Sequence, residues 1–257
     1  MLELKNIYKT FNPGTINEKR ALNGLNLKLN EGDFVTVIGG NGAGKSTMLN
    51  AVAGTWPVDE GQILIDNIDV TKLSEHKRAT YLGRVFQDPM TGTAATMGIE
   101  ENLALAKRRG KSRLLRSGIT KAEREEYKEL LKILGLGLED RLTSKVGLLS
   151  GGQRQALTLL MATLQKPKLL LLDEHTAALD PKTAEIVMQL TGKIVKEKKV
   201  TTIMVTHNLR YAVEYGDRLL MMHQGHAIID KAGAEKKAMQ VDDILGTFNE
   251  ISIECGN

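Results

Sequence analysis

The first third of the chain alternates hydrophobic and polar residues, which is the pattern of strands that expose one face to water. Leu25–Leu29 and Gly61–Asn67 both alternate in this way, and Phe34–Ile38 follows the turn signal Asn30–Asp33. Strands with one wet face are typical of antiparallel sheets. Part of the segment 1–88 is therefore predicted to form an antiparallel sheet.

From Pro89 to about Gln165 the apolar residues recur at the spacing of helices. Thr120 and Glu123 have the spacing of a capping box, which opens a helix, and the apolar face that follows ends near Gly135. The members of this face are Tyr127, Leu130, Leu131 and Leu134. The pattern predicts that this part of the chain is mainly helical.

Strand and helix patterns alternate after Lys166. Leu169–Leu172 is continuously apolar, as expected of a parallel strand covered on both faces. A helical pattern from Pro181 to about Lys199 and a second apolar strand, Thr201–Val205, follow it. This order predicts a βαβ unit.

A glycine-rich segment matches the phosphate-loop pattern G-x-x-x-x-G-K-[ST]. Glycines let backbone N–H groups approach the oxygens of a triphosphate, and a helix that begins near Lys45 adds free amides at its positive end. The pattern requires a strand before the loop and a helix after it, and Phe34–Ile38 and Ser46–Ala53 meet this requirement. We predict that Lys45 contacts the β- and γ-phosphates and that Ser46 binds Mg²⁺. The residues expected to line the nucleotide are Gly39, Asn41, Gly42, Ala43, Gly44, Lys45, Ser46 and Thr47.

These segments together predict an α/β protein with a P-loop nucleoside triphosphatase core. The sheet of the core is expected to be mixed and mainly parallel, with an antiparallel β subdomain and an inserted helical subdomain. We expect a single domain, 1–257, in which 1–88 and 166–257 form the core and 89–165 form the helical subdomain.

Two carboxylates follow the apolar strand 169–172. A carboxylate at the carboxyl end of a parallel strand, beside a phosphate loop, is placed to bind Mg²⁺ directly or through water. Asp173 is predicted to take this role. Glu174, the next residue, is predicted to polarise the attacking water. The alternative for Glu174 is a solvated charge at the end of the strand.

A second helix start lies at Leu149–Gln155. Ser150 and Gln153 have the spacing of a capping box. Gly151 and Gly152 cost the first turn about 1 kcal/mol each relative to alanine. Because these glycines leave amides uncovered at the positive end of the helix dipole, we predict a second anion site here.

The motifs, in their order, resemble those of the ATP-binding subunit of an ATP-binding cassette (ABC) transporter. They are residues 39–46, Leu149–Gln153, Leu171–Glu174 and Val205–His207, and Leu-Ser-Gly-Gly-Gln is specific to that superfamily. The resemblance covers nearly the whole chain. It implies that two copies enclose two ATP molecules, each held by the phosphate loop of one copy and by the signature residues Ser150, Gly151, Gly152 and Gln153 of the other.

The resemblance also implies roles for single residues. Phe11 matches the aromatic residue that stacks on adenine, although Tyr8 is close enough to compete for that role. Gln87 matches a glutamine that contacts Mg²⁺ or water and links the helical subdomain to the core. Asp180 matches the loop that crosses the dimer interface, and His207 matches the histidine that contacts the γ-phosphate. The residues alone also allow a structural interpretation of two of these positions. Asp180 before a proline is typical of a helix start, and His207 is a histidine at the end of a predicted buried strand, which requires no ligand.

Two residues depart from the family's pattern. His175 follows Glu174 where the family usually has proline, and we interpret it as a tolerated loop residue because proline supplies no chemistry there to replace. Ala178 precedes Leu179 where serine is common. This second departure weakens the case for a hydrogen bond across the dimer interface.

Composition limits the class of protein. The chain has 257 residues, of which 42% are hydrophobic and 26% charged, as in ordinary globular proteins. No apolar run approaches the roughly 20 residues of a membrane-spanning helix, and the N-terminus lacks the pattern of a secretory signal. A single cysteine, Cys255, excludes an internal disulfide. We expect a soluble intracellular protein.

The net charge of +4 suits an anionic ligand, a membrane surface or nucleic acid and does not choose among them. Basic residues cluster in one stretch with a single acidic residue, Glu123, and they are Lys107, Arg108, Arg109, Lys111, Arg113, Arg116, Lys121 and Arg124. We interpret this basic segment as a solvated face. The alternative is a contact with anionic lipid head groups or with an acidic loop of a partner.

The resemblance implies a Mg-ATP-hydrolysing subunit that drives a separate membrane permease from the cytoplasmic face of the membrane. The expected partners are a second copy, a permease contacted through the helical subdomain and the region of Gln87, and indirectly an extracytoplasmic solute-binding protein. Detached subunits of this size resemble prokaryotic importers. Residues 173–181 and 207–212 resemble a subgroup assigned to tryptophan/tyrosine or related amino-acid uptake.

Other functions remain as alternatives. A non-transport ATPase in a soluble assembly complex of the iron–sulfur type, or a lipid or export system, would use the same motifs. Nucleic-acid-associated members of the superfamily resemble tandem cassettes or cassettes split by long coiled coils, whereas this chain has one cassette and no sustained heptads. We therefore expect no nucleic acid as a partner. A small-molecule kinase has no use for Leu149–Gln153.

Overall fold

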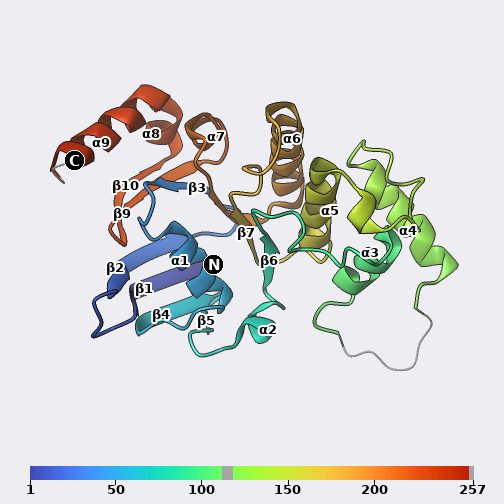
Figure 1. The fold of residues 1–257 in the computed structure, drawn as a ribbon, viewed down its shortest axis with the longest axis horizontal. Helices are drawn as coiled ribbons and strands as arrows, with labels where there is room; N and C mark the ends of the chain where they lie inside the picture. The colour runs from blue at the N-terminus through green and yellow to red at the C-terminus, as the bar shows by residue number, and fades with distance from the viewer. Residues whose placement is uncertain (112–117, 255–257) are drawn as a thin grey trace. The chain divides into compact units, whose positions relative to one another are not determined.

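The computed structural model describes residues 1–111 and 118–254. It divides into two units, Met1–Arg78 with Thr201–Asn257 and Ala79–Val200. Figure 1 shows the helices and strands of both units, coloured by their order along the chain. Cys255 lies outside the described residues. Among the helices that are described, none combines the length and the hydropathy needed to cross a membrane.

The first unit contains an antiparallel sheet, as predicted for part of residues 1–88. Its strand order is β2-β1-β4-β5, and every pairing in it is antiparallel. The strands are β1 (Leu2–Phe11), β2 (Lys19–Leu29), β4 (Glu60–Ile65) and β5 (Ile68–Asp69). Leu25, Leu27 and Leu29 are buried while Asn26 and Lys28 are exposed, so the alternation in the sequence follows the two faces of the sheet.

A second sheet region of the first unit is mainly parallel. Its strands lie in the order β10-β9-β3-β8; β3 runs parallel to both of its neighbours, and β10 runs antiparallel to β9. The strands are β3 (Phe34–Gly39), β8 (Thr201–Val205), β9 (Arg218–His223) and β10 (His226–Ala232). All five residues of β8 are buried, which confirms the predicted apolar strand.

The helices of the first unit are α1 (Lys45–Ala53), α2 (Glu75–Arg78), α7 (Leu209–Glu214), α8 (Gly233–Ala238) and α9 (Val241–Glu254). Ile38 of β3 packs in a buried cluster with Ala212 of α7, Ile244 of α9 and two residues of β9. This cluster anchors the end of β3, where the phosphate loop begins.

The second unit combines a parallel strand pair with helices. β6 (Leu82–Val85) and β7 (Leu169–Asp173) pair in parallel, and Leu169–Leu172 are fully buried, as predicted. The other elements are α3 (Ile99–Lys107), α4 (Lys121–Lys132), a 3₁₀ turn (Val146–Leu148), α5 (Gly151–Thr163) and α6 (Pro181–Lys198). The predicted helical segment 89–165 lies within this unit. The antiparallel strands, the mainly parallel strands and the helices of the two units agree with the predicted α/β class. The strand–loop–helix arrangement of residues 34–53 agrees with it as well.

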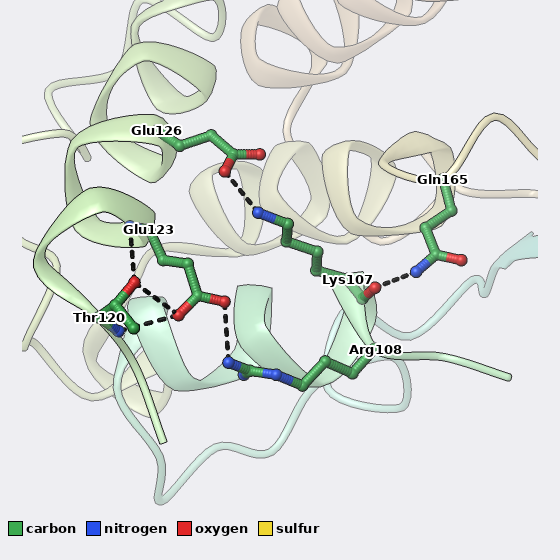
Figure 2. Close-up of polar contacts among 6 residues, drawn as sticks. All are labelled: Lys107, Arg108, Thr120, Glu123, Glu126 and Gln165. Atoms are coloured by element: carbon green, nitrogen blue, oxygen red, sulfur yellow. Dashed lines mark hydrogen bonds and ion pairs between the residues drawn. The ribbon is translucent and has the colours of Figure 1, made fainter. Parts of the chain in front are cut away.

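The capping box of α4 is present and also takes part in an ion pair (Figure 2). Thr120 N–H donates to Glu123 Oε2 at 2.8 Å, and Arg108 Nη2 donates to Glu123 Oε1 at 2.8 Å. The backbone hydrogen bond from Thr120, aided by the charge of Arg108, holds the pKa of Glu123 below its usual value. One carboxylate therefore both caps α4 and connects it to the end of α3.

Other cations of the basic segment are also paired with glutamates. Lys107 pairs with Glu126 on α4, and Arg124 Nε lies 2.7 Å from Glu100 on α3. The Lys107 carbonyl accepts a hydrogen bond from Gln165, which extends the network of Figure 2. These contacts make the described part of the basic segment a connection between α3 and α4 rather than a purely solvated face. Arg113 and Arg116 lie outside the described residues.

A buried arginine stabilises the end of α1. Arg78 is 1% exposed, and its guanidinium donates to the carbonyls of Ala51 and Val52 in the last turn of α1, at 2.7 and 2.9 Å. It also donates to the carbonyls of Thr71 and Leu73 at 2.8 and 2.9 Å. Burial lowers the pKa of Arg78. A positive charge at this position stabilises helix carbonyls that have no partner within the helix.

Replacing Arg78 is expected to destabilise the protein strongly. Arg78→Met removes the guanidinium that four carbonyls bind, in two buried and two partly buried hydrogen bonds, and should lower the free energy of unfolding by about 2–4 kcal/mol in urea titrations. Arg78→Lys should recover only part of this loss because one ammonium cannot reach four divergent carbonyls. Lys77→Met, at the exposed neighbour, is the control. Equal midpoints for Arg78→Met and Lys77→Met would contradict the prediction.

Candidate functional site

The phosphate loop of the first unit connects β3 to α1. Gly39 and Gly44 have φ of 151° and 102°, in the region that favours glycine. A Cβ at Gly39 would lie 2.3 Å from the carbonyl oxygen of Met222, and one at Gly44 would lie 2.5 Å from that of Ala21. Both positions therefore require glycine for two reasons, the backbone conformation and the close approach of neighbouring strands.

Lys45, the first residue of α1, lies inside this loop. It is 5% exposed, and its Nζ donates to the carbonyls of Gly39 at 2.7 Å and Gly40 at 3.0 Å. A Cβ at Gly40 would meet nothing within 4 Å, so the front of the loop is open. An ammonium group, a helix N-terminus and a loop open in front fit the phosphates of a nucleoside triphosphate.

The other predicted residues of the loop divide by exposure. Asn41, Gly42 and Ser46 are exposed, whereas Ala43, Gly44 and Thr47 are buried. The exposed side chains lie where a ligand can reach them. Ser46 in particular presents its hydroxyl on the first turn of α1, as its predicted role requires.

A turn far along the chain is hydrogen-bonded to the phosphate loop. Gly225, between β9 and β10, donates its N–H to the carbonyl of Ala43 at 3.0 Å and accepts from Asn23 N–H at 3.2 Å. β9 and β10 pair as antiparallel strands on either side of this turn. Its contact with the loop joins residues about 180 positions apart, and no local pattern predicts such a pairing.

Two further predicted residues of the first unit lie at strand ends. His207 is exposed and follows β8, which is held beside β3 by the hydrogen bond from Thr206 N–H to the carbonyl of Val37 at 3.1 Å. Phe11 ends β1, and its ring centroid lies 5.0 Å from that of Trp56 in an edge-to-face arrangement. Trp56 was missed by sequence reasoning because nothing local relates it to Phe11.

Tyr8, the competing aromatic residue, is engaged elsewhere. A Cβ at Gly24 of β2 would lie 2.9 Å from the Tyr8 hydroxyl, so the Tyr8 side chain crosses the neighbouring strand at a position without a side chain. Phe11 lies at the end of β1, and like Tyr8 it is partly buried. The position of the Tyr8 side chain over Gly24, and not a difference in burial, makes Phe11 the better candidate for the predicted contact with adenine.

In the second unit the two predicted carboxylates end β7. Asp173 is its last residue and Glu174 follows it, both partly buried. Arg84 Nη2 lies 3.7 Å from Asp173 Oδ2, so the expected Mg²⁺ ligand also has a cationic neighbour. Glu174 has φ of 47°, which is uncommon for a residue other than glycine and turns the chain sharply after the strand.

His175 differs from its interpretation as a tolerated loop residue. It is 2% exposed, and its Nε2 lies 3.0 Å from Oγ1 of Thr191 on α6. Burial lowers the pKa of His175 to about 4, so the imidazole is neutral at neutral pH. The residue is therefore part of the interior of the second unit.

The signature residues open α5 as the sequence predicts. Ser150 is the N-cap, with Gln153 N–H donating to Ser150 Oγ at 3.3 Å and Ser150 N–H donating to Gln153 Oε1 at 3.2 Å. A Cβ at Gly152 would lie 2.0 Å from Cγ2 of Thr183. Gly152 thus allows α5 to approach the start of α6. Close packing is therefore a second reason for a glycine at this position, in addition to the uncovered amides.

Asp180 caps the helix that approaches Gly152. Its Oδ1 accepts from Thr183 N–H at 3.1 Å, and the hydrogen bonds from Thr183 lower its pKa. Asp180 is exposed. The predicted helix start is therefore present. The side chain of Asp180 also lies at the surface, as its implied role in the loop that crosses the dimer interface requires.

Gln87 lies in the exposed segment after β6. The preceding residue, Phe86, accepts a hydrogen bond at its carbonyl from Nε2 of Gln155 at 2.9 Å. Gln155 is fully buried on α5, two residues after Gln153. This bond, which sequence reasoning missed, connects the signature helix directly to the strand end that carries Gln87.

The predicted ligands fit Mg²⁺ by their chemistry. Ser46, Asp173 and Gln87 offer a hydroxyl, a carboxylate and an amide oxygen, which are the hard oxygen donors that Mg²⁺ prefers. Among the described residues no group of three or more His, Cys, Asp or Glu side chains is arranged to hold a metal. Mg²⁺ bound mainly by a nucleotide and by one or two protein groups needs no such cluster.

The fold and the phosphate loop define a P-loop nucleoside triphosphatase, and comparisons with known proteins define its family. A model described as "ABC transporter" matches residues 22–177. The chain belongs to the ABC transporter family, as one of its ATP-binding subunits, and the enzymatic activity of this family is ATP hydrolysis.

The relatives agree along nearly the whole chain. A tyrosine transport ATP-binding protein of Clostridioides difficile is 46% identical over 249 residues, which cover 96% of this chain and 98% of the relative. A phosphonates import ATP-binding protein of Halalkalibacterium halodurans is 31% identical over 253 residues, covering 96% and 94%.

Solved structures agree as well. A dimeric ATP-binding cassette in a post-hydrolysis state, bound to ADP and Pi, matches with a TM-score of 0.76 and 34% identity over 90% of this chain and 98% of that one. The ADP conformation of another cassette matches with a TM-score of 0.79 and 28% identity over 100% and 99%.

The two signature glycines are expected to respond differently to alanine. Gly152→Ala brings a methyl group against Thr183 and should lower the free energy of unfolding by about 1–2 kcal/mol, measured without nucleotide. Gly151→Ala, whose Cβ would lie 3.2 Å from the flexible end of Leu179, is the control and should change stability little. Adding Thr183→Ser, which removes Cγ2, should restore most of the stability of Gly152→Ala. Failure of this rescue would contradict the close-packing explanation.

Proposed function

We propose that the chain is the Mg-ATP-hydrolysing subunit of an importer and works as a dimer with two ATP molecules at the interface. In each half, Lys45 and the loop amides bind the β- and γ-phosphates, and Ser46, Asp173 and Gln87 hold Mg²⁺. The observation that carries the proposal is Lys45 held inside a glycine loop at the start of α1.

In the proposed reaction Glu174 orients and polarises the attacking water, and His207 contacts the γ-phosphate. A carboxylate at a strand end suits this role because it accepts a proton from water during attack on phosphorus. Mg²⁺, when bound, neutralises charge on the phosphate oxygens. The loop amides and Lys45 act on the same charge through hydrogen bonds that exist before the reaction.

The second copy would supply Ser150, Gly151, Gly152 and Gln153 to the nucleotide, with Asp180 at the interface. Ser150 and Gly151 are exposed at the N-terminus of a 13-residue helix, which favours an anion. The dimeric cassette bound to ADP and Pi, 34% identical to this chain, supports this arrangement.

Transport is proposed to occur through a separate permease at the cytoplasmic face of the membrane. The helical part of the second unit and the region of Gln87 would contact it, and an extracytoplasmic solute-binding protein would deliver the solute. Because the relative with 46% identity is a tyrosine transport protein, we propose import of an aromatic or related amino acid. The phosphonate relative, at 31% identity, supports import but a different solute.

Replacing Glu174 tests the catalytic proposal. Glu174→Gln keeps the size of the side chain and removes its basicity, so kcat should fall by at least about 100-fold. ATP affinity should be retained and an ATP-bound dimer should accumulate in size-exclusion chromatography. Glu197→Gln, at an exposed glutamate near the end of α6, is the matched control. Turnover unchanged by Glu174→Gln would remove Glu174 from the role of base.

The same variant tests the coupling to transport. In cells whose own gene carries Glu174→Gln, uptake of labelled tyrosine or tryptophan should stop, whereas cells with Glu197→Gln should take up both normally. If the cells with Glu174→Gln lose phosphonate uptake and keep amino-acid uptake, a phosphonate replaces the amino acid as the proposed solute. Normal uptake of all three, together with co-purification of soluble partners, would favour an assembly ATPase.

Replacing Phe11 tests the adenine contact. Phe11→Ala should weaken ATP binding by about tenfold because stacking on an aromatic ring contributes on the order of 1–3 kcal/mol. Tyr8→Phe, which keeps the ring and removes the hydroxyl, should bind ATP normally. Trp56 is the single tryptophan and contacts Phe11, so its fluorescence should change when ATP binds. Equal ATP affinities for Phe11→Ala and the parent would exclude Phe11.

A further inference from the structure

His175 is a buried polar residue that the proposed reaction does not use. It follows Glu174 directly and is 2% exposed, and its partner, Thr191, is fully buried on the third turn of α6. Burying an imidazole without a hydrogen bond is costly. The contact between His175 Nε2 and Thr191 Oγ1, at 3.0 Å, satisfies this requirement.

The second bond of Thr191 decides the direction of the first. Thr191 Oγ1 donates its only proton to the carbonyl of Val187, at 2.8 Å. The hydroxyl must therefore accept from His175, which makes Nε2 the protonated nitrogen. A chain of two directed bonds, from His175 to Thr191 to the backbone of α6, thus holds the imidazole in one orientation.

This chain of bonds holds a loop that begins in a strained conformation. Glu174 has φ of 47°, a region that a glutamate adopts only where the surrounding structure enforces it. Ala177 N–H donates to the carbonyl of Glu174 at 2.9 Å, and Asp180 caps α6 at the end of the loop. The side chain of His175 connects this loop to Thr191, a buried residue in the middle of α6.

We propose that His175, through its hydrogen bond to Thr191, is a positioning residue for Glu174: it fixes the turn after β7 against α6 and so fixes the direction of the Glu174 carboxylate. The proposal rests on the proposed role of Glu174 as the base. A carboxylate must be held within a fraction of an ångström of its reacting position to be effective. Proline, the usual residue of the family at position 175, restricts the backbone by itself. In this chain the side chain of His175, anchored to Thr191, takes over that restriction.

Two substitutions of Thr191 separate positioning from packing. Thr191→Val keeps the shape and removes the acceptor, and it should lower the kcat of ATP hydrolysis by about tenfold while KM for ATP stays within about twofold. Thr191→Ser keeps the hydroxyl and should retain the parent kcat. Thr163→Val is the matched control because Thr163 is also fully buried in a helix, on α5, and its hydroxyl bonds to carbonyls of its own helix.

Thermal unfolding of the same variants completes the test. Thr191→Val and Thr163→Val should both lower Tm, but only Thr191→Val should lower kcat. His175→Gln, which keeps a donor at the end of the side chain, should retain more of kcat than His175→Leu. The proposal is overturned if Thr191→Val keeps the parent kcat, or if Thr191→Ser loses as much as Thr191→Val.

Glu174→Gln, assayed in parallel, distinguishes the two proposals. If Glu174→Gln abolishes turnover while Thr191→Val does not lower it, Glu174 remains the base and only the positioning role fails. If Glu174→Gln leaves turnover unchanged, the role of the base fails and the positioning proposal falls with it.

Discussion

The close approach of backbone to backbone around the phosphate loop is the constraint on which the rest of the structure depends. A Cβ at Gly39 would overlap a carbonyl oxygen of β9, and a Cβ at Gly44 would overlap a carbonyl oxygen of β2. Gly225 adds a hydrogen bond from the turn after β9 to the loop. Because β2, β9 and the turn after β9 hold the loop, its amides and Lys45 are already ordered for the proposed nucleotide, and less ordering would have to accompany binding.

Buried or partly buried cations at helix ends stabilise the elements that carry the candidate site. Arg78 binds carbonyls at the end of α1, Lys198 Nζ donates to the carbonyl of Thr163 at the end of α5, at 2.8 Å, and Lys236 binds the carbonyls that follow α7. In each case the charge meets the negative end of a helix dipole. Two of these helices, α1 and α5, begin at residues predicted to bind phosphates, and positive charge lies at their opposite ends.

Loops anchored to helices explain how the second unit keeps its functional groups in place. Asp180 caps α6, Gly152 lets α5 pack against the same helix start, and His175 is bonded to Thr191 further along α6. Gln155 connects α5 to the strand end before Gln87. Three cations of the basic segment, Lys107, Arg108 and Arg124, in contrast pair with glutamates of α3 and α4, so this part of its positive charge connects the two helices.

The amino-acid sequence by itself determined the local features of this protein. Alternation, capping boxes and the glycine spacing of the loop depend on residues within a few positions of each other, and β3, α1, α4, α5 and α6 formed where these patterns predicted. The contacts of Arg78 with α1, Gly225 with Ala43, Trp56 with Phe11 and His175 with Thr191 were decided only by the tertiary structure. These pairs are 16 or more positions apart, and the partner of a buried polar group is chosen by whichever segments the fold brings to it, a choice that no periodicity in the chain records.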